Sequence, residues 1–231
     1  MPQRIVINQV PIEWSEAGDR LTFFGIDAVI FWKDPSLLSI LKPLREELGE
    51  DLFHLLVAYE ASKGTYEDYH QMVESLGDSF PEGFRNWGQA VSGAGWGHFD
   101  LQALDWDRST ARVRIDRPWE LALFRPAEPD NGVPFLSGKL SGIFSWAFDT
   151  HCRARVTEIG DTADGPYAVL DIAPSTATLA DELERLQEKR GLSAEAYLQA
   201  ANRHLRENLE RFVEVLEATG EFIWGTDRQF R

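Results

Sequence analysis

Apolar residues in this chain change their spacing once, near Gly97, and this change limits the fold more than any other feature of the sequence. Between residues 34 and 92 they recur at helical spacing. Beyond Gly97 they alternate with polar residues, as in strands that bury one face. Helices followed by an antiparallel meander predict an α+β domain, with an antiparallel sheet and packed helices.

Four helices are predicted before that change. The first begins at Asp34, a favourable N-cap, with Pro35 in the first helical position, and it ends at Gly49. The other three are expected over residues 51–62, 66–76 and 81–92.

Strands account for most of the rest of the domain. They are expected over residues 4–9 and 21–32, around 99–104, 113–115 and 121–123, and over 151–160 and 166–173. One more helix is predicted over residues 135–148, and its small residues are expected to let it lie close to a sheet. These small residues are Gly138, Ser141, Gly142 and Ser145.

The last part of the chain has a helical pattern of its own. Thr178 can cap a helix that ends near Gly191, and Ser193 can cap a second that continues to about Ala218. Two interleaved seven-residue series in the second helix predict a parallel two-stranded coiled coil, and therefore a homodimer. The predicted dimer interface consists of Leu198, Asn202, Leu205, Leu209, Phe212 and Leu216. The alternative is an amphipathic helix that packs on its own domain.

Charge and composition exclude several classes of partner. The formal net charge is −15, so a nucleic acid would be repelled. The sequence has neither a run of 18 apolar residues nor a signal peptide, which favours a cytoplasmic protein without a membrane partner. The single cysteine, Cys152, cannot form an internal disulfide, as expected in a reducing compartment.

No motif for catalysis or metal binding stands out. The five histidines lack a paired spacing that would put two imidazoles on one metal ion, so no metal site is expected. His54, within an apolar helical pattern, leaves a haem ligand open as an alternative to no cofactor. His151 and Cys152 are neighbours in a strand pattern and would point to opposite faces. The chain is therefore expected not to be an enzyme itself.

Large aromatic residues are unusually frequent, with 8 Trp and 14 Phe. So many rings can fill a core or line a cavity for a small apolar ligand. The cavity is expected between the helices of residues 50–92 and the sheet. The candidate lining residues are Phe53, Tyr59, Trp87, Trp96 and Phe144.

Residues 26–174 resemble the 4-vinyl reductase domain family of small-molecule-binding domains. The resemblance rests on Gly95-Trp96-Gly97 before the meander, on Gly138 and Gly142 in the following helix, and on Glu158 and Gly165 in the last hairpin. It implies a pocket for a hydrocarbon-like ligand. Members of that family often carry zinc-binding cysteines around the last hairpin, and this hairpin has none, so zinc is not expected.

The final residues, EATGEFIWGTDRQFR, resemble the opening strand of a PAS domain. Together these patterns predict a sensory domain over residues 1–175, a signalling helix over 176–220 and the start of a PAS-like domain over 221–231. The expected function is small-molecule sensing in a sensor kinase or diguanylate cyclase. The alternatives are an enzyme or carrier for a small hydrophobic substrate, and a purely structural dimerisation module.

Overall fold

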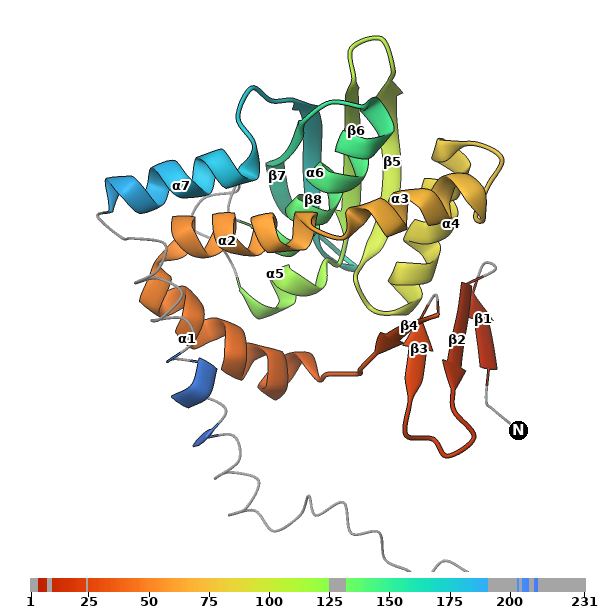
Figure 1. Cartoon of the computed structure of the whole chain (residues 1–231), viewed down its shortest axis with the longest axis horizontal. Coiled ribbons are helices and arrows are strands. Elements are labelled where there is room, and N and C mark those ends of the chain that lie inside the picture. Colours follow the sequence, from red (N-terminus) through yellow and green to blue (C-terminus); the bar gives the residue numbers. More distant parts are fainter. Residues whose placement is uncertain are drawn as a thin grey trace, which may run out of the picture.

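The computed structural model describes residues 4–7, 10–23, 25–124 and 132–190, together with 203, 205–207, 210 and 211. Two antiparallel sheets and a set of helices make up this part of the chain (Figure 1). The strands are β1 Arg4–Ile7, β2 Val10–Trp14, β3 Leu21–Phe23, β4 Ile26–Ala28, β5 His98–Asp105, β6 Thr110–Asp116, β7 Cys152–Thr162 and β8 Gly165–Pro174. The helices are η1 Lys33–Leu37, α1 Leu38–Leu48, α2 Glu50–Ser62, α3 Thr65–Glu74, α4 Phe80–Gly93, α5 Trp119–Leu123, α6 Pro134–Phe148 and α7 Leu179–Lys189. The predicted α+β class is confirmed.

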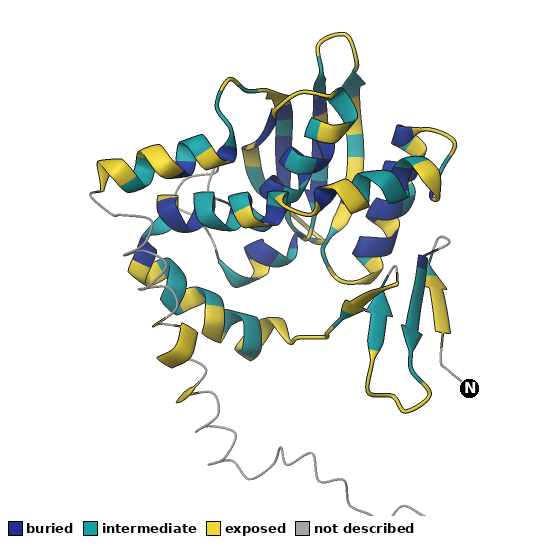
Figure 2. Cartoon of the chain, in the orientation of Figure 1, coloured by how far each residue is buried: buried dark blue, intermediate teal, exposed yellow. Residues whose placement is uncertain are grey.

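The larger sheet has the strand order β5-β6-β8-β7 and carries the main core. Its strands alternate, so that β6 buries Ala111, Val113 and Ile115 on one face. Helices α4 and α6 pack on this sheet, and α2 and α3 pack in turn on α6 (Figure 1). Buried residues gather in this layered region and are sparse in the N-terminal sheet (Figure 2).

Small residues of α6 allow close packing on two sides. A Cβ atom at Gly138 would overlap the carbonyl oxygen of Ala58 in α2, and one at Gly142 would lie 2.7 Å from the carbonyl oxygen of Ser62. On the other side, Ser141 Oγ accepts a hydrogen bond of 2.9 Å from the Ala154 backbone N–H in β7. The sequence predicted that the small residues let α6 lie close to a sheet. Ser141 bonds to the sheet, whereas Gly138 and Gly142 allow close contact with helix α2.

The N-terminal sheet has the order β1-β2-β3-β4 and lies beside α4. It joins the main core through Val10, which is fully buried, and through the partly buried Phe23. The single strand predicted over residues 21–32 is wrong. A turn at Gly25, with φ of 75°, divides it into β3 and β4, and residues 29–32 follow without regular structure.

Two further local predictions differ from the structure. Asp34 is not the N-cap of α1, because regular helix begins only at Leu38, with Leu37 in the N-cap position, and Asp34 lies within the preceding irregular turn η1. Leu121 and Leu123 lie in helix α5 and not in a strand. Pro118 precedes this helix, and Glu120 in its first turn bonds to α6, so the chain turns away from the sheet after β6.

Helix α7 begins as predicted, with a complete capping box formed by Thr178 and Asp181. It packs against α2, where Leu183 is 7% exposed. The predicted coiled coil lies outside the described residues, except for isolated positions. Among its interface residues the structure describes Leu205, which is 48% exposed.

Replacing Gly138 with alanine should destabilise the fold by about 3 kcal/mol, because the added methyl group meets backbone that cannot move aside. Gly93→Ala is the matched control, since its methyl group meets the flexible end of the Ile7 side chain at 2.6 Å. Urea unfolding of both variants measures the difference. Equal stability of the two would contradict the close packing of α6 on α2.

Candidate functional site

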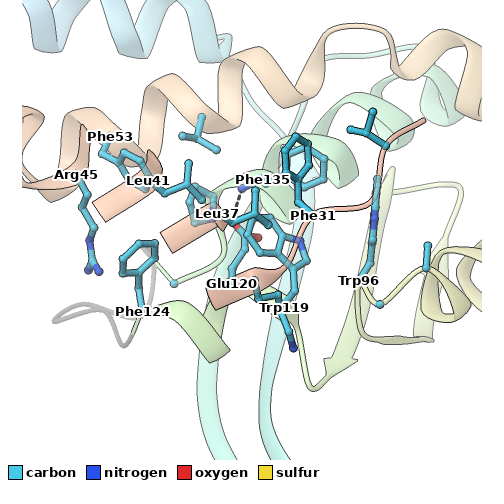
Figure 3. A pocket seen from close by; sticks show the side chains of 17 residues that line it. Phe31, Leu37, Leu41, Arg45, Phe53, Trp96, Trp119, Glu120, Phe124 and Phe135 are labelled. Carbon is cyan, nitrogen blue, oxygen red and sulfur yellow. Dashed lines mark hydrogen bonds between the residues drawn. The ribbon is translucent and has the colours of Figure 1, made fainter. Parts of the chain in front are cut away.

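A cavity of about 400 Å³ lies between helices α1 and α2 on one side and α5 and the start of α6 on the other (Figure 3). Its wall is mainly apolar and aromatic. The lining residues are Val29, Phe31, Lys33, Leu37, Leu41, Arg45, Phe53, Val57, Ala94, Gly95, Trp96, Trp119, Glu120, Phe124, Gly132, Pro134 and Phe135. The turn after α4, the short helix α5 and the first turn of α6 therefore meet around one space.

Aromatic rings in the wall contact one another edge to face. Phe135 stands between Trp96, at 5.1 Å between ring centroids, and Trp119, at 5.9 Å. Phe53 and Phe124 form a second pair at 6.4 Å. Edge-to-face contacts of this kind hold rings in fixed orientations. The wall therefore presents a set of oriented ring surfaces to the cavity.

Glu120 is the acidic residue of the wall, and it is 4% exposed. Its two carboxyl oxygens accept hydrogen bonds from the first turn of α6, at 2.8 Å from the Phe135 N–H and 3.0 Å from the Leu136 N–H. Burial raises the pKa of Glu120 to about 8, although the two backbone hydrogen bonds act in the opposite direction. The cavity thus contains a carboxyl group that is largely protonated at neutral pH.

Two basic residues, Lys33 and Arg45, complete the polar part of the wall. Arg45 forms an ion pair of 2.5 Å with Glu50, and its guanidinium lies 4.9 Å from the centre of the Phe124 ring. The Arg45 side chain is therefore held both by Glu50 of α2 and by the Phe124 ring of the cavity wall.

The five predicted ligand-binding residues do not line one cavity. Phe53 and Trp96 line the cavity described above. Tyr59 borders a separate hollow between α2, α6 and the start of α7. Trp87 is 1% exposed and borders, with Trp96, a hollow beside β3 and β4. Phe144 is fully buried in the core.

Sequence reasoning missed Glu120 and most of the wall supplied by α1 and α5. The available signal was an acidic residue inside the apolar run WELAL, where the alternation of Leu121 and Leu123 predicts a strand. Leu37, just before α1, and Leu41, within it, belong to an amphipathic helical pattern that does not indicate what its apolar face covers.

The other candidate groups lie elsewhere. His54 is buried in α2 and is not part of the cavity wall. Burial raises the pKa of Cys152 to about 11, so its thiol is protonated at neutral pH. Within the described residues, no three His, Cys, Asp or Glu side chains are grouped as a metal site would need. No helix in the described part of the chain is long and apolar enough to span a bilayer.

Comparison with known proteins shows a similarity to a solved structure. No protein-family model matches the chain. No curated protein matches it. Among solved structures, the chain is similar to the phenol-responsive sensory domain of the transcription activator PoxR, determined with phenol. The TM-score is 0.55 at 11% sequence identity, over 70% of this chain and 84% of that chain. The two chains therefore share a fold.

Glu120 should make stability depend on pH. Its pKa is about 8 in the folded protein and near 4.5 in an unfolded chain, so folded molecules bind the extra proton between these values. The stabilisation is complete below about pH 4.5 and is lost as the pH rises through about 8, by at most about 5 kcal/mol.

Denaturant unfolding at several pH values measures this loss. Glu120→Gln, which stays neutral, should flatten the pH dependence, whereas Glu46→Gln on the exposed face of α1 should preserve it. If the free energy of unfolding of Glu120→Gln changes with pH as steeply as that of the original protein, burial of Glu120 does not control the pH dependence.

Proposed function

We propose that this chain is a ligand-sensing domain that binds a small, mainly apolar aromatic molecule in the cavity between α1, α2, α5 and α6. The observation that carries the proposal is the ring-lined cavity of about 400 Å³, a volume within the usual range of small-molecule sites. The fold shared with the phenol-responsive domain of PoxR supports the same class of function.

The placement of α7 supports a sensory role. Leu41, Phe53 and Val57 line the cavity and also belong to the apolar cluster that packs around Leu183 of α7. The side chain of Arg190 donates a hydrogen bond to the carbonyl oxygen of Leu48, where α1 ends. A ligand that moves the α1 and α2 wall would therefore act directly on the helix that leads toward the C-terminus.

Further parts of the proposal concern the longer protein. In it, α7 continues into a dimeric signalling helix that leads to a PAS-like region and an output of the sensor kinase or diguanylate cyclase type, in the cytoplasm. The domain has no catalysis or cofactor of its own in this proposal. The resemblance to the 4-vinyl reductase family fits it. An enzyme or carrier for a small hydrophobic substrate is the second candidate, favoured by the same mainly apolar wall.

Phenol should bind to the purified chain and raise its melting temperature, because a ligand that binds the folded state stabilises it. Calorimetry gives the affinity, and quenching of the cavity residues Trp96 and Trp119 gives a second signal. Val57→Phe fills the cavity from α2 and should weaken binding at least about tenfold. The control Ile30→Phe lies at an exposed position outside the wall and should bind normally. If Val57→Phe binds phenol with unchanged affinity, phenol binds outside this cavity.

Ligand binding should also protect α7. Saturating phenol should slow amide hydrogen exchange in residues 179–189, because the cavity wall and α7 share one apolar cluster. Leu183→Ala should reduce this effect while leaving phenol affinity within about threefold, since Leu183 does not line the cavity. If amide hydrogen exchange in α7 does not change when phenol binds, the proposed route of the signal is contradicted.

A further inference from the structure

We infer that Glu120 makes this cavity selective for neutral aromatic molecules that carry a small hydrogen-bonding group, such as a hydroxyl or amino group, on the ring. The inference rests on the proposed ligand-sensing function and goes beyond it, because it names the chemical class of the ligand and the residue that selects it. It starts from the one buried carboxyl group among the aromatic rings of the wall.

The carboxyl group of Glu120 can make further hydrogen bonds. The backbone N–H groups of Phe135 and Leu136 occupy one acceptor position on each oxygen, which leaves the O–H of the protonated group and further lone pairs for a ligand. The group is 4% exposed, so bulk water reaches little of it. A buried O–H without an acceptor costs free energy, and a ligand hydroxyl or amino group that reaches the carboxyl group can accept from this O–H.

The surrounding wall explains why the ligand should be aromatic. Phe135 contacts Glu120 through its backbone N–H, and its ring packs edge to face with Trp96 and Trp119. Trp119 and Glu120 thus come from α5 and Phe135 from the start of α6, while Trp96 comes from the turn after α4. A ring that packs against these faces brings its substituent close to the oxygens of Glu120 (Figure 3).

Desolvation favours a neutral ligand. A carboxylate on the ligand would lose its hydration among the aromatic rings, and Arg45 is already paired with Glu50. An ammonium group would lose its hydration in the same way and would share the cavity with Lys33 and Arg45. A hydroxyl or a neutral amino group can bond to Glu120 without these costs.

Glu120 also anchors the first turn of α6, and a purely structural role would account for its two hydrogen bonds. The two roles differ in one measurable property. An anchor affects the affinity of all ligands alike, through the stability of the wall. A recognition group changes the ratio of affinities between ligands with and without a hydrogen-bonding group.

Calorimetric titration of the purified chain with phenol, aniline, toluene and benzoate at pH 7 tests the inference. Phenol and aniline should each bind at least about tenfold more tightly than toluene, as one hydrogen bond to a buried carboxyl group provides, and benzoate should bind more weakly than phenol. Toluene binding as tightly as phenol, or benzoate binding more tightly, would overturn the inference while leaving the proposed function intact. Absence of binding by all four would overturn both.

Glu120→Met, which removes both acceptors at similar side-chain length, should reduce the preference for phenol over toluene to about threefold or less while toluene affinity is kept. Glu46→Gln, an exposed carboxyl group of α1 outside the wall, should keep the full preference. If the preference for phenol over toluene persists in Glu120→Met, a group other than Glu120 is responsible for it. Thermal melts establish that each variant is folded, and if Glu120→Met is not, the four-ligand series on the unmodified chain decides the matter alone.

Discussion

The contact between α6 and α2 sets the spacing on which the rest of the structure depends. Helix α6 has to touch the large sheet with one side and α2 with the other, and its glycines and serines leave room for both. Since α2 is held so close to α6, this contact limits the space between α1, α2 and the first turn of α6. The cavity is the part of that space that side chains do not fill. A larger residue at Gly138 would therefore alter the core and the cavity together.

Glu120 joins a structural and a chemical role in one side chain. Its hydrogen bonds to the first turn of α6 supply acceptors for two backbone N–H groups that no helical carbonyl can reach. The same placement removes the carboxyl group from water, which is costly for its charged form. An uncharged, pre-oriented glutamine would not satisfy both N–H groups, because its amide nitrogen is a donor. A carboxyl group is the smallest polar end that accepts from both neighbours and still faces the cavity.

Sequence periodicity predicted most of the elements, because long amphipathic helices and alternating strands depend mainly on local patterns. Sequence periodicity predicted the wrong element where tertiary contacts determine the local structure. The apolar run around Leu121 and Leu123 is compatible with a strand as well as with a short helix. The hydrogen bond between Glu120 and the backbone of α6 favours the helix. The candidate site could be predicted only in part for the same reason. Phe53 and Trp96 are recognisable as large rings, but which rings face an unfilled space depends on packing that no spacing reveals.

The arrangement of layers gives the cavity a mechanical link to the chain beyond it. Helices α1 and α2 form the wall on one side of the cavity, and the cluster with Leu183 lies on the other side of that same wall. The salt bridge from Arg153 in β7 to Glu182 fixes the start of α7 to the sheet, which does not border the cavity. In the proposed function, α7 is held between a fixed support and a wall that the ligand would contact. A ligand would shift α7 only by binding one position of that wall more tightly than another, so contacts to α1 and α2 would carry the signal, whereas contacts to α5 and α6 would supply affinity and selectivity.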